Sequence, residues 1–142
     1  YTAYLKEKVV NKMKIRILFF IPLFLFFIYG CAQNNADAEI KYKDITSEEL
    51  NQMLDSREDL FLVDVHIPEQ QHIKGTDAFI PYNEIESNLG SLPDKNAKIV
   101  LYCRSGSMSM EASETLVKLG YKNVYNHLGG ANDWKLKGFG FE

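Results

Sequence analysis

The chain has 142 residues, of which 46% are hydrophobic and 25% charged, a composition typical of one globular domain rather than of a disordered chain. Lys and Arg number 16 against 19 Asp and Glu, and the net charge of -3 argues against a nucleic-acid binder that works by neutralising phosphates. The 2 cysteines are too few for a disulfide-rich scaffold or a four-cysteine zinc site.

The first thirty residues differ from the rest in charge, with five Lys or Arg against one Glu, whereas the remainder carries a net charge of -7. An uninterrupted apolar run, residues 17–28, follows the basic Lys14 and Arg16. As a helix this run would span about 18 Å, well short of a hydrocarbon core of roughly 30 Å. Residues 1–30 are therefore predicted to be upstream residues and a signal peptide rather than a membrane span.

The residues after the apolar run, Tyr29-Gly30-Cys31-Ala32, resemble the lipobox of bacterial lipoproteins, although a small residue is usual in place of Tyr29. The resemblance implies that Cys31 becomes the lipid-bearing N-terminus of an exported protein anchored to a bacterial membrane. An ordinary cleavable signal peptide is the alternative. The polar residues 31–39 would form a flexible tether, and we expect the folded domain over residues 40–142.

Strand-like and helix-like patterns alternate along this domain, which predicts an α/β fold with a small parallel sheet flanked by helices. The expected strands are residues 40–45, 60–65, 78–81, 98–102 and 123–125. The expected helices are one capped by Thr46 or Ser47, then residues 82–89, 107–119 and 131–137. The strands 60–65 and 98–102 are apolar almost throughout, a pattern that predicts burial on both faces.

Cys103 directly follows the expected strand 98–102 and precedes a helix, and reactive groups of parallel sheets lie at the carboxyl ends of strands. In the intervening turn, inward-pointing backbone N–H groups and the helix N-terminus favour a thiolate. Arg104 adds a cation next to the sulfur-bearing residue. Cys103 is therefore the candidate nucleophile, and the alternative is a small buried apolar residue at a strand end.

Asp64 interrupts the apolar run 60–65, and two roles are open for its carboxylate. In one it pairs with Arg104 and orients the loop after Cys103. In the other it accepts hydrogen bonds from nearby backbone N–H groups. His66 and His72 are candidate proton donors, although structural or surface roles are more common for lone histidines, and Trp134 is expected in the core.

On these residues the chain resembles the rhodanese-like sulfurtransferase family. Residues 103–107 (Cys-Arg-Ser-Gly-Ser) are similar to the active-site loop of that family. Residues 62–65 and 71–75 resemble its Asp-Val strand and the His-Ile element downstream. Residues 128–130, Trp134 and residues 138–139 resemble its C-terminal Gly-Gly, Trp and Gly-aromatic pattern. The resemblance covers residues 43–141.

The resemblance implies a single rhodanese-like domain that transfers sulfane sulfur through a Cys103 persulfide. The active-site loop would consist of the next six residues, Arg104, Ser105, Gly106, Ser107, Met108 and Ser109. The implied partners are a small-molecule or protein sulfane-sulfur donor and a thiol or cyanide acceptor, and this chemistry requires no metal or organic cofactor.

Two positions depart from the family pattern. Met108 stands where many members have a basic residue or Thr, and His66 where they have Arg. The missing charge at Met108 counts against thiosulfate as the donor and favours a larger, less charged persulfide.

The same residues bear on three other functions. A phosphatase of this fold needs an Arg six residues after the cysteine, where this chain has Ser109. A thiol redox sensor or disulfide exchanger normally has a resolving cysteine, and acylation of Cys31 would leave none. A non-catalytic binding module at the membrane surface is the alternative that Met108 keeps open.

Overall fold

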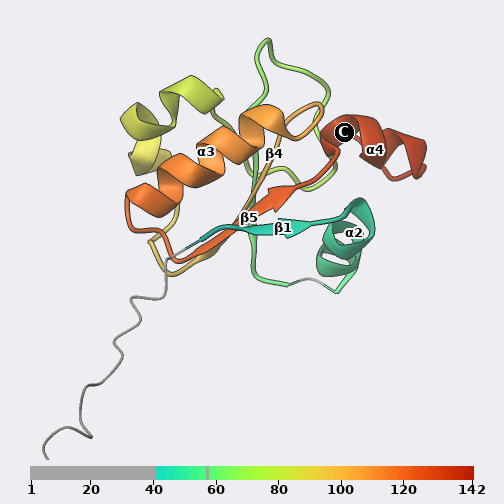
Figure 1. Cartoon of the computed structure of the whole chain (residues 1–142). Helices are drawn as coiled ribbons and strands as arrows, with labels where there is room; N and C mark the ends of the chain where they lie inside the picture. The colour runs from blue at the N-terminus through green and yellow to red at the C-terminus, as the bar shows by residue number, and fades with distance from the viewer. Residues whose placement is uncertain (1–40, 57) are drawn as a thin grey trace, which may run out of the picture. The chain divides into compact units, whose positions relative to one another are not determined.

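The computed structural model describes residues 41–56 and 58–142 (Figure 1). The strands are β1 (Lys43–Ile45), β2 (Phe61–Asp64), β3 (Ala78–Phe79), β4 (Lys98–Tyr102) and β5 (Asn123–His127). The helices are α2 (Ser47–Asp55), the 3-10 helix η2 (Tyr82–Ser91), α3 (Ser107–Lys118) and α4 (Gly130–Leu136). Strands and helices therefore alternate along most of the domain, as the sequence predicts.

The sheet has the strand order β1-β5-β4-β2-β3, and every pairing in it is parallel. The central strand β4 pairs with β2 on one side and with β5 on the other. Because all strands run in the same direction, their carboxyl ends gather at one edge of the sheet. The residues that follow β2, β4 and β5 consequently meet at that edge.

Alternate residues of β4, together with the residue that follows it, belong to two separate apolar clusters, one on each face of the sheet. Ile99, Leu101 and Cys103 belong to the cluster that also holds side chains of η2 and α3. Val100 and Tyr102 belong to the cluster that also holds Leu50 of α2 and Trp134 of α4. Figure 1 shows α3 on one side of the sheet and α2 with α4 on the other. The predicted burial of this strand on both faces is confirmed.

The first helix of the described region begins with a capping box. The Thr46 hydroxyl accepts a hydrogen bond from the Glu49 backbone N–H at 3.2 Å, and the Thr46 N–H donates to the Glu49 carboxylate at 2.8 Å. Two N–H groups that lack a partner within the helix are thereby satisfied. Of the two caps considered from the sequence, Thr46 is the one that forms, and Ser47 is the first residue of α2.

Other boundaries differ from the sequence-based expectation in ways that long-range contacts explain. Strand β5 continues to His127, two residues further than expected, because its later residues still pair with β1. The expected helix 82–89 is a 3-10 helix that extends to Ser91 and has a kink at Asn88. The predicted signal peptide, the predicted tether and Cys31 lie outside the described residues. No helix within residues 41–56 and 58–142 has both the length and the apolar character needed to cross a membrane.

Candidate functional site: a cysteine loop at the carboxyl edge of the sheet

Cys103 is the first residue after β4, and only three residues separate it from the start of α3. The chain reverses within this short connection at Gly106, whose φ of 98° lies in the left-handed region. Residues with a β-carbon rarely adopt that conformation, so glycine is the residue that permits the turn. The turn brings the first amides of α3 back towards the cysteine side chain.

The Cys103 sulfur accepts hydrogen bonds from this loop. The Gly106 backbone N–H donates to Sγ at 3.1 Å, and the Ser109 hydroxyl oxygen lies 3.7 Å from Sγ. Burial raises the pKa of the thiol, but hydrogen-bond donors of the loop, of which the backbone N–H groups of Ser109 and Ser105 have the largest effect, lower it by more. The net result is a thiol pKa below its ordinary value, which is the condition for a nucleophilic thiolate.

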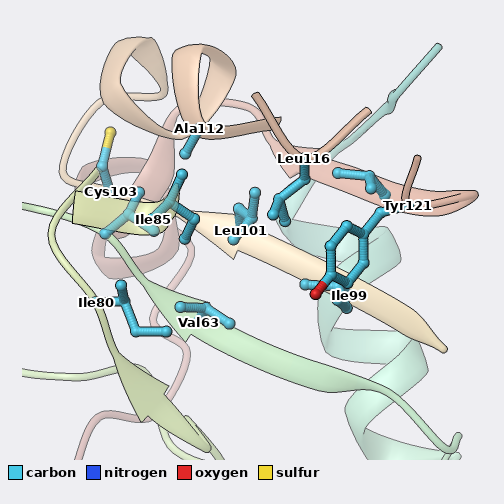
Figure 2. Close-up of a cluster of buried hydrophobic side chains, with 11 residues drawn as sticks. Val63, Ile80, Ile85, Ile99, Leu101, Cys103, Ala112, Leu116 and Tyr121 are labelled. Carbon is cyan, nitrogen blue, oxygen red and sulfur yellow. The ribbon is translucent and has the colours of Figure 1, made fainter. Parts of the chain in front are cut away.

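Cys103 also belongs to the apolar cluster beneath α3, and only 1% of the residue is exposed. Figure 2 shows its sulfur on the far side of the residue from Ile80 and Val63 of that cluster. Cys103 thus combines the two descriptions that the sequence allowed, a buried residue at a strand end and a sulfur held by backbone N–H groups.

The beginning of α4 binds the backbone of Cys103 and Arg104. The Ala131 N–H donates to the Cys103 carbonyl at 2.8 Å, and the Asn132 N–H donates to the Arg104 carbonyl at 3.0 Å. A β-carbon at Gly130 would lie 2.2 Å from the Cys103 carbonyl oxygen. The Gly129-Gly130 pair therefore lets α4 approach Cys103 and Arg104 closely enough to form these hydrogen bonds.

Asp64, at the end of β2, does not play the role of partner to Arg104. Its buried carboxylate accepts from the His66 backbone N–H at 2.9 Å and from the Gln70 amide at 3.2 and 3.3 Å, and it lies 3.1 Å from Nδ1 of His72. No ion pair between Asp64 and Arg104 is present among residues 41–56 and 58–142. Pairing with Arg104 is therefore wrong, and Asp64 instead organises the loop that follows its own strand.

The two histidines considered as proton donors both belong to the loop after β2. His66 is buried, and its Nδ1 lies 2.7 Å from the Pro68 carbonyl, so this nitrogen donates to a fixed backbone oxygen. His72 is partly exposed and lies between two carboxylates, with Nδ1 facing Asp64 and Nε2 facing Glu69, each at 3.1 Å. These contacts give both rings a structural role in the loop.

The remaining residues of the cysteine loop divide by exposure. Arg104, Ser105 and Ser107 are exposed, and Ser109 is fully buried. Met108 is partly buried and packs against the apolar cluster beneath α3. Trp134 is 2% exposed and belongs to the second cluster, which confirms its expected core position.

Two groups of polar residues near the loop were not singled out from the sequence. Asn126 of β5 accepts a hydrogen bond from the Ser109 hydroxyl at 2.7 Å and donates one to Asp44 of β1 at 2.8 Å. Beneath α4, the Ser47 hydroxyl lies 2.8 Å from Nε2 of the buried His127 and 2.5 Å from the Asp133 carboxylate. In each group, two of the bonded residues lie 80 or more positions apart in the chain: Asn126 and Asp44 in the first, Ser47 and His127 in the second. No local sequence pattern therefore marks either group.

The described part of the chain contains no group of three or more His, Cys, Asp or Glu side chains arranged to hold a metal ion. The reactive group that the structure places at this site is the Cys103 sulfur, with the hydrogen-bond donors around it.

Comparisons with known proteins agree on the family of this fold. Residues 38–137 match the model of the family described as "Rhodanese-like domain". A protein named "Sulfurtransferase" from Allochromatium vinosum is 35% identical over 97 residues, which cover 67% of this chain and 90% of that protein. "Thiosulfate sulfurtransferase PspE" from Escherichia coli is 37% identical over 75 residues, or 50% of this chain and 70% of that protein.

Solved structures give the same result. The crystal structure of a rhodanese-like domain protein from Staphylococcus aureus superimposes with a TM-score of 0.61 at 31% identity, covering 70% of this chain and 96% of that one. The expected single α/β domain with a parallel sheet flanked by helices is confirmed by this likeness and by the five-stranded sheet.

Proposed function

Because this chain belongs to the rhodanese-like domain family, we propose that it is an exported sulfurtransferase that carries sulfane sulfur as a persulfide on Cys103. The observation that carries the proposal is the set of hydrogen bonds on the Cys103 sulfur, of which the Gly106 N–H at 3.1 Å is the shortest. These donors lower the thiol pKa in spite of burial, which favours the nucleophilic thiolate form.

The transfer proceeds in two displacements. The Cys103 thiolate attacks the outer sulfur of a donor of the type R–S–S–H, a new S–S bond forms, and the donor leaves as the thiolate R–S⁻. An acceptor thiolate then attacks the outer sulfur of the Cys103 persulfide, takes it, and releases the Cys103 thiolate. The charge stays on sulfur throughout, so fixed backbone N–H groups stabilise every anionic state of the residue.

The donor is a persulfide rather than thiosulfate in this proposal. Met108 packs against the apolar cluster and brings no charge to the loop. Exposed Arg104 is the one cation among residues 104–109, which leaves little to hold a small dianion. A persulfide on a protein or a low-molecular-weight thiol has an apolar or extended carrier group instead, and it requires less charge in the pocket.

Mass spectrometry of the full chain after incubation with glutathione persulfide tests the proposal. Wild-type protein is expected to gain one sulfur atom on the peptide that contains Cys103, and a thiol acceptor is expected to remove it. The Cys103→Ser variant should gain none on that peptide, while Cys31→Ser, the matched control, should behave like wild type. Equal sulfur transfer by Cys103→Ser would refute the assignment.

The alternative function is a catalytically weak binding or thiol redox-sensing module that keeps the fold. The 1% exposure of Cys103 is the observation that favours it, because a sulfur without access cannot react. The same experiment separates the two functions. A Cys103 peptide that stays unmodified at every donor concentration would favour the binding module.

Export and lipid anchoring form a separate part of the proposal and are supported by the sequence of residues 14–31. Expression of the full chain in a bacterial host should give a membrane-bound protein whose N-terminal peptide carries acyl chains on Cys31. The Cys31→Ala variant should be released from the membrane fraction. An unmodified N-terminus in the wild-type protein would contradict lipidation.

A further inference from the structure

The Ser109 hydroxyl has one proton and several possible acceptors. Its oxygen lies 2.7 Å from Oδ1 of Asn126, 3.1 Å from the Gly106 carbonyl and 3.7 Å from the Cys103 sulfur. A hydroxyl donates one hydrogen bond at a time and accepts others through its lone pairs. The shortest and strongest of these contacts is the one to Asn126, which therefore competes with Cys103 for the proton.

The Asn126 side chain has only one orientation that satisfies its neighbours. On the side away from Ser109, its amide lies 2.8 Å from the Asp44 carboxylate. A carboxylate accepts hydrogen bonds and donates none, so the NH2 group of Asn126 must face Asp44. Its carbonyl oxygen then faces Ser109, and that oxygen can only accept. Asp44 thus fixes Asn126, and Asn126 fixes the direction in which Ser109 donates.

We infer that Asp44 and Asn126 are positioning residues that turn the Ser109 proton away from Cys103, so that the sulfur faces the lone pairs of the hydroxyl oxygen. The inference rests on the proposed function, in which the charge on Cys103 governs sulfur transfer. A protonated thiol can donate to this oxygen. A thiolate gains a hydrogen bond from Ser109 only after the hydroxyl leaves Asn126.

The three residues come from separate elements of the fold. Asp44 lies on the edge strand β1, Asn126 on the neighbouring strand β5, and Ser109 in the first turn of α3. Asn126 and Ser109 are buried, with exposed fractions of 2% and 0%. Burial of these two residues removes water as a competing partner for the hydrogen bond between them, and its direction is then set by the protein groups alone.

The consequence is that Asp44 and Asn126 hold the Cys103 thiol less acidic than the loop would otherwise make it. Replacing Asn126 by Leu, which has a similar shape, removes the preferred acceptor and leaves the Gly106 carbonyl at 3.1 Å and the Cys103 sulfur at 3.7 Å. Of these two, a thiolate is the charged acceptor, so the hydroxyl is then able to stabilise it. Replacing Asp44 by Asn supplies a donor on that side, so the Asn126 amide can reverse and donate to Ser109. Both changes are expected to favour the thiolate.

The pH dependence of Cys103 alkylation measures this effect without requiring sulfur transfer. Full-length protein is treated with iodoacetamide over a range of pH, and the Cys103 peptide is quantified separately from the Cys31 peptide by mass spectrometry. For Asn126→Leu and for Asp44→Asn, the midpoint of the rate profile should fall by about one pH unit relative to wild type. Urea unfolding verifies that each variant is folded. If Asn126→Leu is unstable, Asp44→Asn alone tests the inference, because Asp44 is exposed and its substitution disturbs no packing in the core.

Two controls separate this effect from a general change in charge or structure. In the Ser109→Ala background, neither substitution should move the midpoint, because the hydroxyl through which they act is missing. Glu114→Gln removes an acidic charge that, like the charge of Asp44, raises the pKa of Tyr42. This variant should leave the midpoint of the Cys103 alkylation profile close to that of wild type. An unchanged midpoint, or an equal shift with and without Ser109, would overturn the inference. Failure of the proposed function would appear instead as a missing persulfide in a protein whose thiol titrates as described.

Discussion

His127 gives the most quantitative prediction of the structure, a loss of stability in mild acid. The residue is the last of β5 and is fully buried, and its ring packs edge-on against Trp134 of α4 with centroids 5.9 Å apart. Ser47 donates its proton to the Asp133 carboxylate, so Nε2 of His127 must donate to the Ser47 oxygen. Nδ1 is then the unprotonated nitrogen, and it is buried without a hydrogen-bond partner.

Burial lowers the pKa of His127 from 6.5 to about 4, and the nearby Asp133 carboxylate offsets only part of this change. A depressed histidine pKa means that the unfolded chain binds the proton first as the pH falls. Stability is therefore complete above about pH 6.5, declines as the pH falls towards 4, and levels off below that. The two pKa values give a loss of about 2 kcal/mol at about pH 5 and of about 3 kcal/mol in total.

Urea unfolding of wild type and His127→Leu at a series of pH values between about 7.5 and 5 measures this contribution. Carboxylates that titrate in the same range affect both proteins, so the difference between the two curves isolates the histidine. The free energy of unfolding of wild type should fall by about 2 kcal/mol more than that of the Leu variant over this range. Parallel curves for the two proteins would show that His127 is not held neutral by burial, and the argument would fail.

Three further predictions concern the loop and its supports. Gly130→Ala places a β-carbon 2.2 Å from the Cys103 carbonyl at a residue with a φ of 57°, so we expect a loss of about 2–4 kcal/mol in urea unfolding and slower persulfide formation. Gly90→Ala, where a β-carbon meets nothing within 4 Å, is the matched control, and equal effects would contradict the close-approach argument. Met108→Arg adds a cation to the loop and should lower the KM for thiosulfate roughly fivefold, whereas Met108→Gln should not; an unchanged KM would count against the charge argument. Thr46→Ala breaks the capping box of α2 and should cost about 1 kcal/mol, and an unaltered midpoint of unfolding would show that the cap is dispensable.

The local sequence was sufficient to predict the cysteine loop. The apolar run of β4, the Cys103-Arg104-Ser105-Gly106 turn and the helix after it are contiguous, so propensity and spacing place the sulfur near the amides of Gly106 and Ser109. The capping box and the alternation of strands and helices are local patterns in the same sense, and the parallel sheet follows from them.

The tertiary structure alone decided which partners the buried polar side chains have. The sequence allowed Asp64 to pair with Arg104 or to cap nearby backbone groups, and the fold places its carboxylate within the loop after β2. Asn126 could be recognised only once β5 lay between Asp44 and Ser109, which are far apart along the chain. A hydrogen bond depends on distance and direction in space, and residues of distant segments acquire these only when the sheet and helices have packed.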